Sequence, residues 1–303
     1  DDVAETGGRI VEAARLAGIG LTLLPVLYQR GGCDGRPLQG GQKRFGNDPD
    51  RFADLWQASA GHVARLGGDA RIGVAPHSLR AVDASGLQAA TALCPDGPIH
   101  IHLAEQVAEV AEVEAHLGAR PARWLMDHHA VDGHWCPIHC THLDDGEVDA
   151  LAASGAVAGL CPVTEANLGD GIFRGEDFAG RGGRFGVGTD SNIAISLSGE
   201  LATLEYGQRL ALRRRAVLAQ TRRSVGRLLW EKANAGGAQA LGRHAGAIAP
   251  GRLADLVELN GDDPRLAERR GDALIDTFVF AAPGGGLVRN VWSAGRHVVV
   301  DGR

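Results

Sequence analysis

Short apolar runs alternate with helical segments along the first 190 residues of the chain. Each run is bounded by Gly, Pro or Asp, and its length is typical of a buried strand. Most of the intervening segments carry apolar residues at helical spacing. The expected strands cover residues 19–27, 71–76, 98–103, 134–140, 156–161 and 184–188. Strands separated by helical or looped crossovers indicate a parallel α/β sheet.

The chain changes character after residue 245. The segments GAIAPGRLADLVELN, DTFVFAA and LVRNVWSAGRHVVVDGR have the composition of short β segments separated by Gly and Pro turns. We therefore predict a barrel-type catalytic domain over residues 1–245 and a small β subdomain over 246–303. A closed barrel of parallel strands needs eight strands. Six runs predict a barrel that lacks strands one and two.

Polar residues stand where three of these runs end, namely His102 with Glu105, then His139, then Asp190. The carboxyl ends of parallel barrel strands meet at one mouth, where barrel enzymes carry their chemistry. His100 and His102 share a strand face, so both imidazoles could ligate one metal. A single histidine of this kind is more often packed or hydrogen-bonded. The neighbouring carboxylates and the third histidine favour a catalytic zinc or iron site.

Two alternatives within this cluster stay open. Glu105 is suited to shuttle a proton beside a metal, and equally suited to place negative charge on the first turn of the next helix. The set His134, Cys136, Cys140 and His142 could form a structural zinc knuckle. Its spacing matches no common finger and it lies in an apolar run, which disfavours the knuckle.

Another pair, His77 and Arg80 in APHSLR, ends the second expected strand. An arginine fork matches a carboxylate with two parallel hydrogen bonds. Alone, the pair would be interpreted as a surface ion pair, but its position at the expected mouth favours substrate binding. The segment TEANLGDG at 164–171 is predicted to be a polar loop that lines the site.

Composition excludes several classes of partner. The formal charge of −6 and the lack of a long Lys/Arg run argue against nucleic acid. No apolar stretch is long enough to span a bilayer. Five cysteines, most of them in apolar runs, are typical of reduced thiols in the cytoplasm. We therefore expect a cytoplasmic protein with a small-molecule substrate.

The motifs HLAE at 102–105, HCTH at 139–142, GTD at 188–190 and the terminal GAIAPGRLADLV together resemble the amidohydrolase superfamily, in its aminohydrolase branch. The segments APHSLRAV, CPVTEANLGDGIF and SVGRLLWEKANAGGAQALG are most similar to the members that deiminate N-formimino-L-glutamate. The resemblance implies a TIM-type (β/α)8 barrel of the metal-dependent hydrolase kind with a small β-sandwich portion at its C-terminal end. It also implies one divalent metal, zinc in the first place and iron in the second.

Site residues carry over from this resemblance by position. His102 matches a metal ligand on the fifth barrel strand, and Glu105 matches the general acid and base. His139 matches a histidine that polarises or protonates the region of the departing group. Asp190 matches a carboxylate that contacts the metal and takes a proton from its water.

His77 and Arg80 match residues that hold the carboxylate end of the substrate. The superfamily's strand-one HxH pair, which supplies two metal ligands, has no counterpart upstream of residue 77. We therefore expect the chain to represent a longer enzyme incompletely, with an incomplete ligand set.

The implied reaction is hydrolytic deimination of N-formimino-L-glutamate to N-formyl-L-glutamate and ammonia, a step of histidine degradation. A metal lowers the pKa of water, so hydroxide becomes available at neutral pH. The implied enzyme is a homodimer. One alternative is a deaminase of a purine or other heterocycle, which would need an aromatic-lined pocket. The other is a non-catalytic barrel scaffold, motivated by the missing HxH pair.

Overall fold

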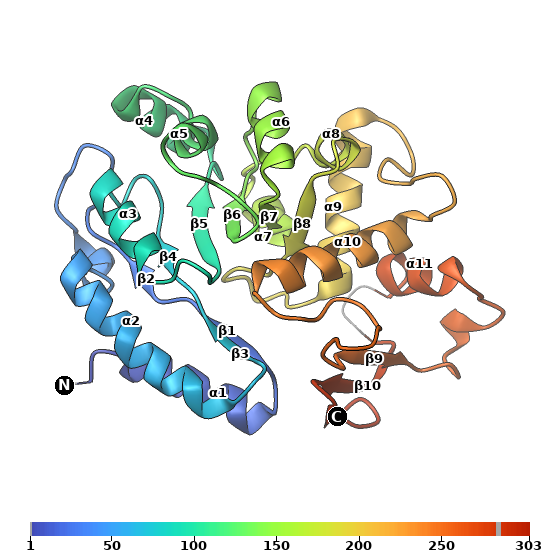
Figure 1. Cartoon of the computed structure of the whole chain (residues 1–303). Coiled ribbons are helices and arrows are strands. Elements are labelled where there is room, and N and C mark those ends of the chain that lie inside the picture. Colours follow the sequence, from blue (N-terminus) through green and yellow to red (C-terminus); the bar gives the residue numbers. More distant parts are fainter. Residues whose placement is uncertain (1, 283–285) are drawn as a thin grey trace.

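Six parallel strand positions form the centre of the molecule in the computed structural model, which describes residues 2–282 and 286–303 (Figure 1). Four of them form one sheet in the order β5-β6-β7-β8. Before them, β1 pairs with β3 and β2 with β4, all in parallel. The strands are β1 (Leu21–Leu23), β2 (Val26–Leu27), β3 (Ala70–Ile72), β4 (Ala75–Pro76), β5 (Ile99–Leu103), β6 (Trp135–His139), β7 (Val157–Leu160) and β8 (Arg184–Val187).

Single bridges from Val74 to Ile99 and from Ser78 to His102 continue the parallel arrangement from β4 to β5. The α/β class and the six parallel strand positions are therefore confirmed. Within residues 2–282 and 286–303, the ladders end at β8 on one side and at β1 and β2 on the other.

The first two expected strands are each divided into two short pieces, which corrects the prediction of continuous strands. Pro25 lies between β1 and β2 and has no N–H to donate to a ladder. Gly73 lies between β3 and β4, and its carbonyl accepts a hydrogen bond from Trp56 Nε1 at 3.1 Å. These local features interrupt the regular pairing without changing the strand direction.

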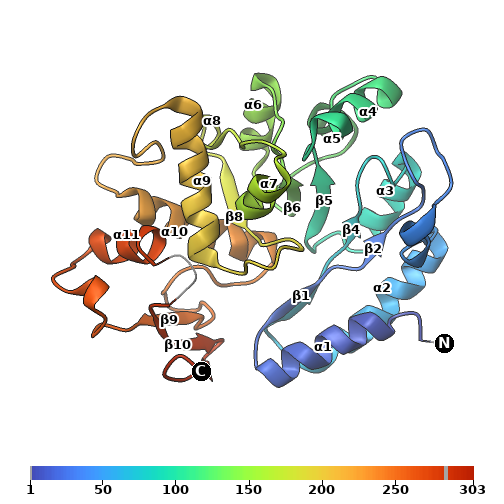
Figure 2. The same cartoon turned by 180° about the vertical axis from the view of Figure 1, so that it is seen from behind.

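Helices cover the outside of the strand array, as the opposite views of Figures 1 and 2 show. Aspartate and serine side chains at the starts of α2, α3, α6, α9 and α10 each accept a backbone N–H of the first turn. No helix among the described residues has the length and apolar character to cross a membrane. The helices are α1 (Glu5–Ala17), α2 (Pro49–Val63), α3 (Ala84–Ala92), α4 (Val107–Leu117), α5 (Pro121–His128), α6 (Asp145–Ser154), α7 (Pro162–Leu168), α8 (Gly175–Gly180), α9 (Leu197–Leu212), α10 (Val225–Ala240) and α11 (Asp272–Phe280).

Two sequence expectations are wrong in this part of the fold. The segment 164–171, expected to be a polar loop after β7, is helical up to Leu168, because Pro162 opens helix α7 at a position that needs no N–H and Gly169 closes it in the left-handed region. The segment DTFVFAA, expected to be β, lies largely in helix α11. Phe278 and Val279 of this helix are buried in the same core as the strands. Burial against this core outweighed the strand preference of these residues.

A three-stranded antiparallel sheet, ordered β11-β10-β9, forms the C-terminal part of the chain. Its strands are β9 (Leu256–Leu259), β10 (Val288–Ser293) and β11 (Arg296–Val299). Arg296 joins this sheet to the start of the chain, since its guanidinium donates to the carbonyl of Gly18 and pairs with Asp69. The sheet therefore lies beside the β1 and β3 end of the parallel array (Figure 1).

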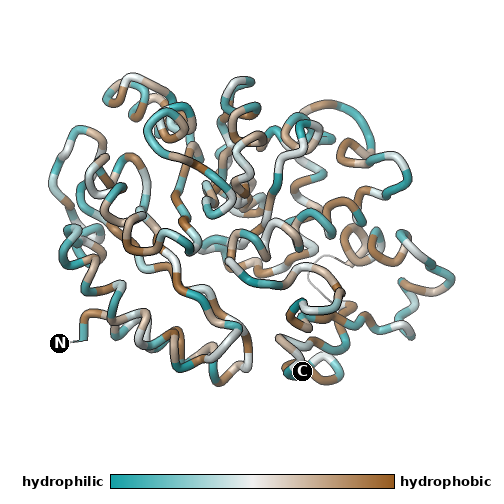
Figure 3. Tube along the Cα trace, viewed as in Figure 1, coloured by the Kyte–Doolittle hydropathy of each residue, from teal (hydrophilic) through white to brown (hydrophobic). Residues whose placement is uncertain are grey.

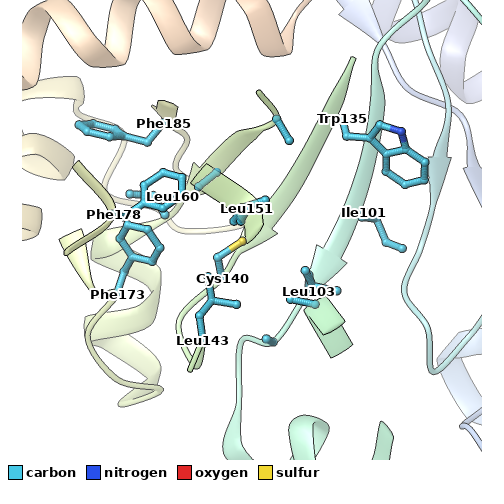
Figure 4. Packing of buried hydrophobic residues seen from close by; sticks show 14 of the residues in the cluster. Ile101, Leu103, Trp135, Cys140, Leu143, Leu151, Leu160, Phe173, Phe178 and Phe185 are labelled. Carbon is cyan, nitrogen blue, oxygen red and sulfur yellow. The ribbon is translucent and has the colours of Figure 1, made fainter. Parts of the chain in front are cut away.

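The hydrophobic core lies between the parallel strands and their helices. Phe173 and Phe178 pack edge to face, with ring centroids 5.3 Å apart. Phe185 of β8 and Leu160 of β7 belong to the same cluster and lie near these two rings (Figure 4). Hydrophobic and hydrophilic residues alternate along α2, as expected for a helix with one face on the core (Figure 3).

We expect Phe178→Ala to lower the free energy of unfolding by about 3–5 kcal/mol, because it leaves a cavity in a closed core. Phe178 is 0% exposed. Urea denaturation followed by circular dichroism measures the change. The matched control is Phe45→Ala, since Phe45 is 58% exposed and its loss should change stability by less than about 0.5 kcal/mol. Equal effects of the two substitutions would contradict this assignment of the core.

Candidate active site

Five polar residues lie at the carboxyl ends of the parallel strands. His102 is on β5, and Glu105 follows two residues after this strand. His139 is the last residue of β6, Glu165 lies in the first turn of α7 after β7, and Asp190 follows β8. The carboxyl ends of parallel strands meet at one face of the molecule, so the fold directs these residues toward one region.

The turns that carry these residues have unusual backbone geometry. Ala104, His139, Cys140 and Asp190 all have positive φ, with values of 54°, 72°, 54° and 51°. A residue with a Cβ adopts this region at a cost of order 1 kcal/mol or more. The strain occurs at or shortly after the carboxyl ends of β5, β6 and β8, where the chain turns to present the site residues.

Glu105 lies between two imidazoles. Its carboxylate oxygens are 3.8 Å from His102 Nε2 and 3.7 Å from His139 Nε2. The two rings meet edge to face with centroids 4.9 Å apart. Burial raises the pKa of Glu105 above its usual value, although the two histidines oppose the shift. A raised pKa brings a carboxyl group closer to the pH at which it can both give and take a proton.

The same three residues fit a metal ion. One ligand atom from each of His102, Glu105 and His139 lies within 4.8 Å of the others. Two imidazole nitrogens and a carboxylate oxygen are a donor set that suits zinc. A second group, His139 with Cys161 and Glu165, also meets this distance and is fully buried.

Asp190 lies outside both groups and is exposed. Its charge nevertheless acts on His139. Burial lowers the pKa of His139, but the hydrogen bond with Glu165 and the charges of Glu105, Glu165 and Asp190 raise it above the usual value. Of the two metal ligands expected from the sequence, the structure therefore brings His102 into a candidate group and leaves Asp190 outside it.

Glu109, which the sequence analysis did not identify, anchors the turn after β5. Its carboxylate is buried, lies 2.8 Å from His102 Nε2 and accepts the backbone N–H groups of Ala104 and Glu105, both at 3.0 Å. Burial disfavours the charged form, but His102 and Arg80 lower the pKa of Glu109 to about 2. The only sequence signal was a glutamate in the first turn of a helix, which is common.

His77 and Arg80 lie beside this cluster. The His77 ring stacks on His102 at a centroid distance of 6.0 Å and meets Tyr28 edge to face at 4.4 Å. Burial, with the nearby charges of His102 and Arg80, lowers the pKa of His77 to about 4. Arg80 Nη2 is 2.9 Å from His102 Nε2. The structure thus brings both predicted substrate residues next to the candidate metal group.

A small pocket of about 100 Å³ opens beside His77 and Arg80. It is predominantly cationic, because three arginines and one glutamate supply its formal charges. The residues that line it are Tyr28, Arg30, Gly31, Arg36, Gln42, His77, Ser78, Arg80, Ala81 and Glu112. The Nε atoms of Arg30 and Arg80 are buried without a hydrogen-bond partner among the described residues.

Two other sequence alternatives receive no support from the geometry. His100 donates from Nε2 to the carbonyl of Ala240 at 2.7 Å, at the end of α10, so it does not join the site. His142 is likewise engaged by the carbonyl of Asp170 at 2.8 Å. In the described part of the chain, the set proposed for a zinc knuckle forms no metal-binding group.

Parallel strands with helical crossovers and polar residues at their carboxyl ends are the arrangement found in enzymes of the TIM-barrel type. Comparison with known proteins specifies the family. Residues 10–298 match the model of the amidohydrolase family. The chain belongs to this family.

Known relatives agree with this assignment. A formimidoylglutamate deiminase of Pseudomonas aeruginosa is 50% identical over 306 aligned residues, which cover 100% of this chain and 66% of that protein. A 5'-deoxyadenosine deaminase of Methanothermobacter thermautotrophicus is 31% identical over 77% of this chain and 53% of its own length. The chain therefore spans just under two thirds of the first relative.

Solved structures show the same fold. The crystal structure of an amidohydrolase from Brucella melitensis superposes with a TM-score of 0.94 at 48% identity, covering 99% of this chain and 66% of that one. A zinc-bound adenosine deaminase from Xanthomonas campestris gives a TM-score of 0.80 at 20% identity, covering 98% of this chain and 64% of that one. This second likeness supports the fold alone.

Proposed function

We propose that the protein deiminates N-formimino-L-glutamate by hydrolysis to N-formyl-L-glutamate and ammonia, as a step of histidine degradation. The observation that carries this proposal is a cationic pocket whose lining residues His77 and Arg80 contact His102, a member of the group formed with Glu105 and His139. The positive charge of the pocket favours binding of the substrate carboxylates. The imidazoles and carboxylate of His102, His139 and Glu105 would face the formimino carbon. The 50% identity to a formimidoylglutamate deiminase over the whole chain supports the same substrate.

Arg80 is our candidate for holding a substrate carboxylate, with His77 beside it. The guanidinium is at the edge of the pocket, and its buried Nε lacks a partner among the described residues. A buried donor without a partner costs about 1–3 kcal/mol, so a ligand that accepts from it is stabilised. The depressed pKa of His77 keeps its ring neutral at pH 7, which allows it to accept as well as donate.

The metal, zinc or iron, would be held by His102 and by Asp190, although Asp190 lies outside the group of His102, Glu105 and His139, and it would supply an activated water when bound. Glu105 would transfer the proton to the departing nitrogen, since burial raises the pKa of its carboxyl group. His139 would polarise the region of the departing group from the other side of Glu105. Asp190, whose charge acts on His139, would accept a proton from water.

Two alternatives compete with this proposal. A deaminase of a purine or other heterocycle needs aromatic surfaces for the ring, and Tyr28 is the only Phe, Tyr or Trp side chain among the residues that line the described pocket. A non-catalytic scaffold would not need a cluster of imidazoles and carboxylates at the strand ends. Both arguments favour deimination of a small dicarboxylate.

We extend the proposal to the whole architecture. A barrel domain over residues 1–245, lacking strands one and two, would be joined to part of a β-sandwich over residues 246–303, in a homodimer. The antiparallel sheet of β9 to β11 supports the second domain. Five free cysteines, four of them buried, support a reducing compartment such as the cytoplasm.

The test uses the purified full-length protein, loaded separately with zinc and with iron(II). We expect stoichiometric metal and release of equal amounts of ammonia and N-formyl-L-glutamate from N-formimino-L-glutamate. Adenosine and guanine serve as competing substrates. Ammonia release from either heterocycle, with none from formimino-glutamate, would establish the first alternative. A protein that holds no metal and turns over none of these compounds would be a scaffold.

A further inference from the structure

A second carboxylate, that of Glu165, lies behind His139. Glu165 is 3% exposed, and its Oε1 is 3.3 Å from His139 Nδ1. A carboxylate oxygen can only accept in such a contact, so Nδ1 donates its hydrogen. The same oxygen accepts the backbone N–H of Cys161 at 3.1 Å. His139 thus has one nitrogen fixed by Glu165 and the other facing Glu105.

The segment that carries Glu165 is itself held in place. Glu200 of α9 accepts the N–H of Val163 at 2.9 Å, and Thr164 donates from its hydroxyl to the carbonyl of Thr189 at 3.1 Å. Thr189 directly precedes Asp190. The first turn of α7 therefore contacts both His139 and the turn after β8. This arrangement is suited to fix the two strand ends relative to each other.

Glu165 and Cys161 could instead be ligands of a separate metal ion together with His139. Two observations disfavour this. Oε1 of Glu165 is already engaged by two N–H donors. The thiolate form that binds metals is disfavoured at Cys161, because burial raises the pKa of its thiol.

We infer that Glu165 is a positioning residue for the proposed deimination: it fixes the Nδ1–H tautomer of His139 and directs Nε2 toward Glu105. This inference rests on the proposed function for its catalytic consequence only. A buried imidazole without such a partner can exchange tautomers and rotate. In part of the molecules Nε2, which faces Glu105, would then carry a hydrogen, and its lone pair would no longer be available at the site.

The first test leaves Glu165 unchanged and measures the tautomer of His139. Full-length protein labelled with ¹⁵N-histidine gives ring-nitrogen resonances whose shifts and couplings report the tautomer, and His139→Asn identifies the His139 signal. We expect the hydrogen on Nδ1 in the neutral state. A neutral His139 with its hydrogen on Nε2 would overturn the inference.

The second test compares two variants. Glu165→Met removes both carboxylate oxygens at similar volume, and we expect a mixture of tautomers, unchanged metal content, and a loss of about 100-fold in kcat with KM changed less than threefold. Glu165→Gln restores an acceptor oxygen, so we expect the Nδ1–H tautomer to return and most of the kcat loss to be recovered. Comparison of Glu165→Met with Glu165→Gln separates the effect of the hydrogen bond from the effect of side-chain volume.

The matched control is Glu147→Met. Glu147 is 2% exposed and also accepts backbone N–H groups, from Asp144 and Arg123, but it pairs with Arg120 rather than with a site histidine. We expect a comparable loss of stability with the tautomer of His139 and kcat unchanged. An equal kcat loss in the control, or a loss of metal from Glu165→Met alone, would overturn the positioning role. If the parent protein lacks deiminase activity, the tautomer measurements still decide the inference.

Discussion

Replacing Glu105 by glutamine in the full-length protein is expected to lower turnover of N-formimino-L-glutamate by roughly 100-fold or more while metal content stays intact. Glutamine keeps the size of the side chain but cannot carry the proton. Glu105 lies 3.8 Å and 3.7 Å from the two imidazoles, and burial raises its pKa, which favours a proton carrier at this place. Steady-state kinetics and metal analysis measure the two outcomes.

Glu205→Gln serves as its control. Glu205 is also buried, but it accepts the backbone N–H groups of Val217 and Leu218 and pairs with Arg209, away from the strand ends. Turnover should be unchanged in this variant. Wild-type turnover in Glu105→Gln would show that Glu105 only places charge at the start of α4. Loss of metal from Glu105→Gln would instead identify the carboxylate as a ligand.

Arg80→Met tests the substrate. If the guanidinium holds a substrate carboxylate, its removal leaves that carboxylate unpaired in a pocket with little water, at a cost of about 2–5 kcal/mol in transition-state binding. This corresponds to a loss of roughly 30-fold or more in kcat/KM for N-formimino-L-glutamate. A formamidine without the carboxylate should show a much smaller loss, because it never used the contact.

Arg120→Met is the control for this arginine. Arg80 and Arg120 have the same side-chain exposure, 28%, and each lies near a buried glutamate, but Arg120 pairs with Glu147. The control should keep kcat/KM for both compounds. Equal losses of Arg80→Met on the two substrates would mean that the arginine only supports the end of the strand.

Local patterns were sufficient to predict much of the fold. The six strand positions follow from the length and flanks of the apolar runs, and Asp83 and Asp144 cap α3 and α6, as an aspartate before a helical segment predicts. The predictions for α7 and α11 failed for a different reason. Their sequences suit more than one state, and burial of residues such as Phe278 in a core built from distant segments selects the helix.

The sequence by itself determined the order of the strands and the polar residues that follow them. Both depend only on residues that are close to one another in the chain. The tertiary structure alone decided which side chains meet. Glu165 contacts His139 across 26 residues, and Arg80 approaches His102 across 22. Hydrogen bonds of this kind depend on strand register and on strained turns such as that at Ala104, which no short segment specifies. For the same reason, Glu109 is an ordinary helix residue in the sequence. Glu165 lies in a segment expected to line the site, but its contact with His139 exists only in the fold.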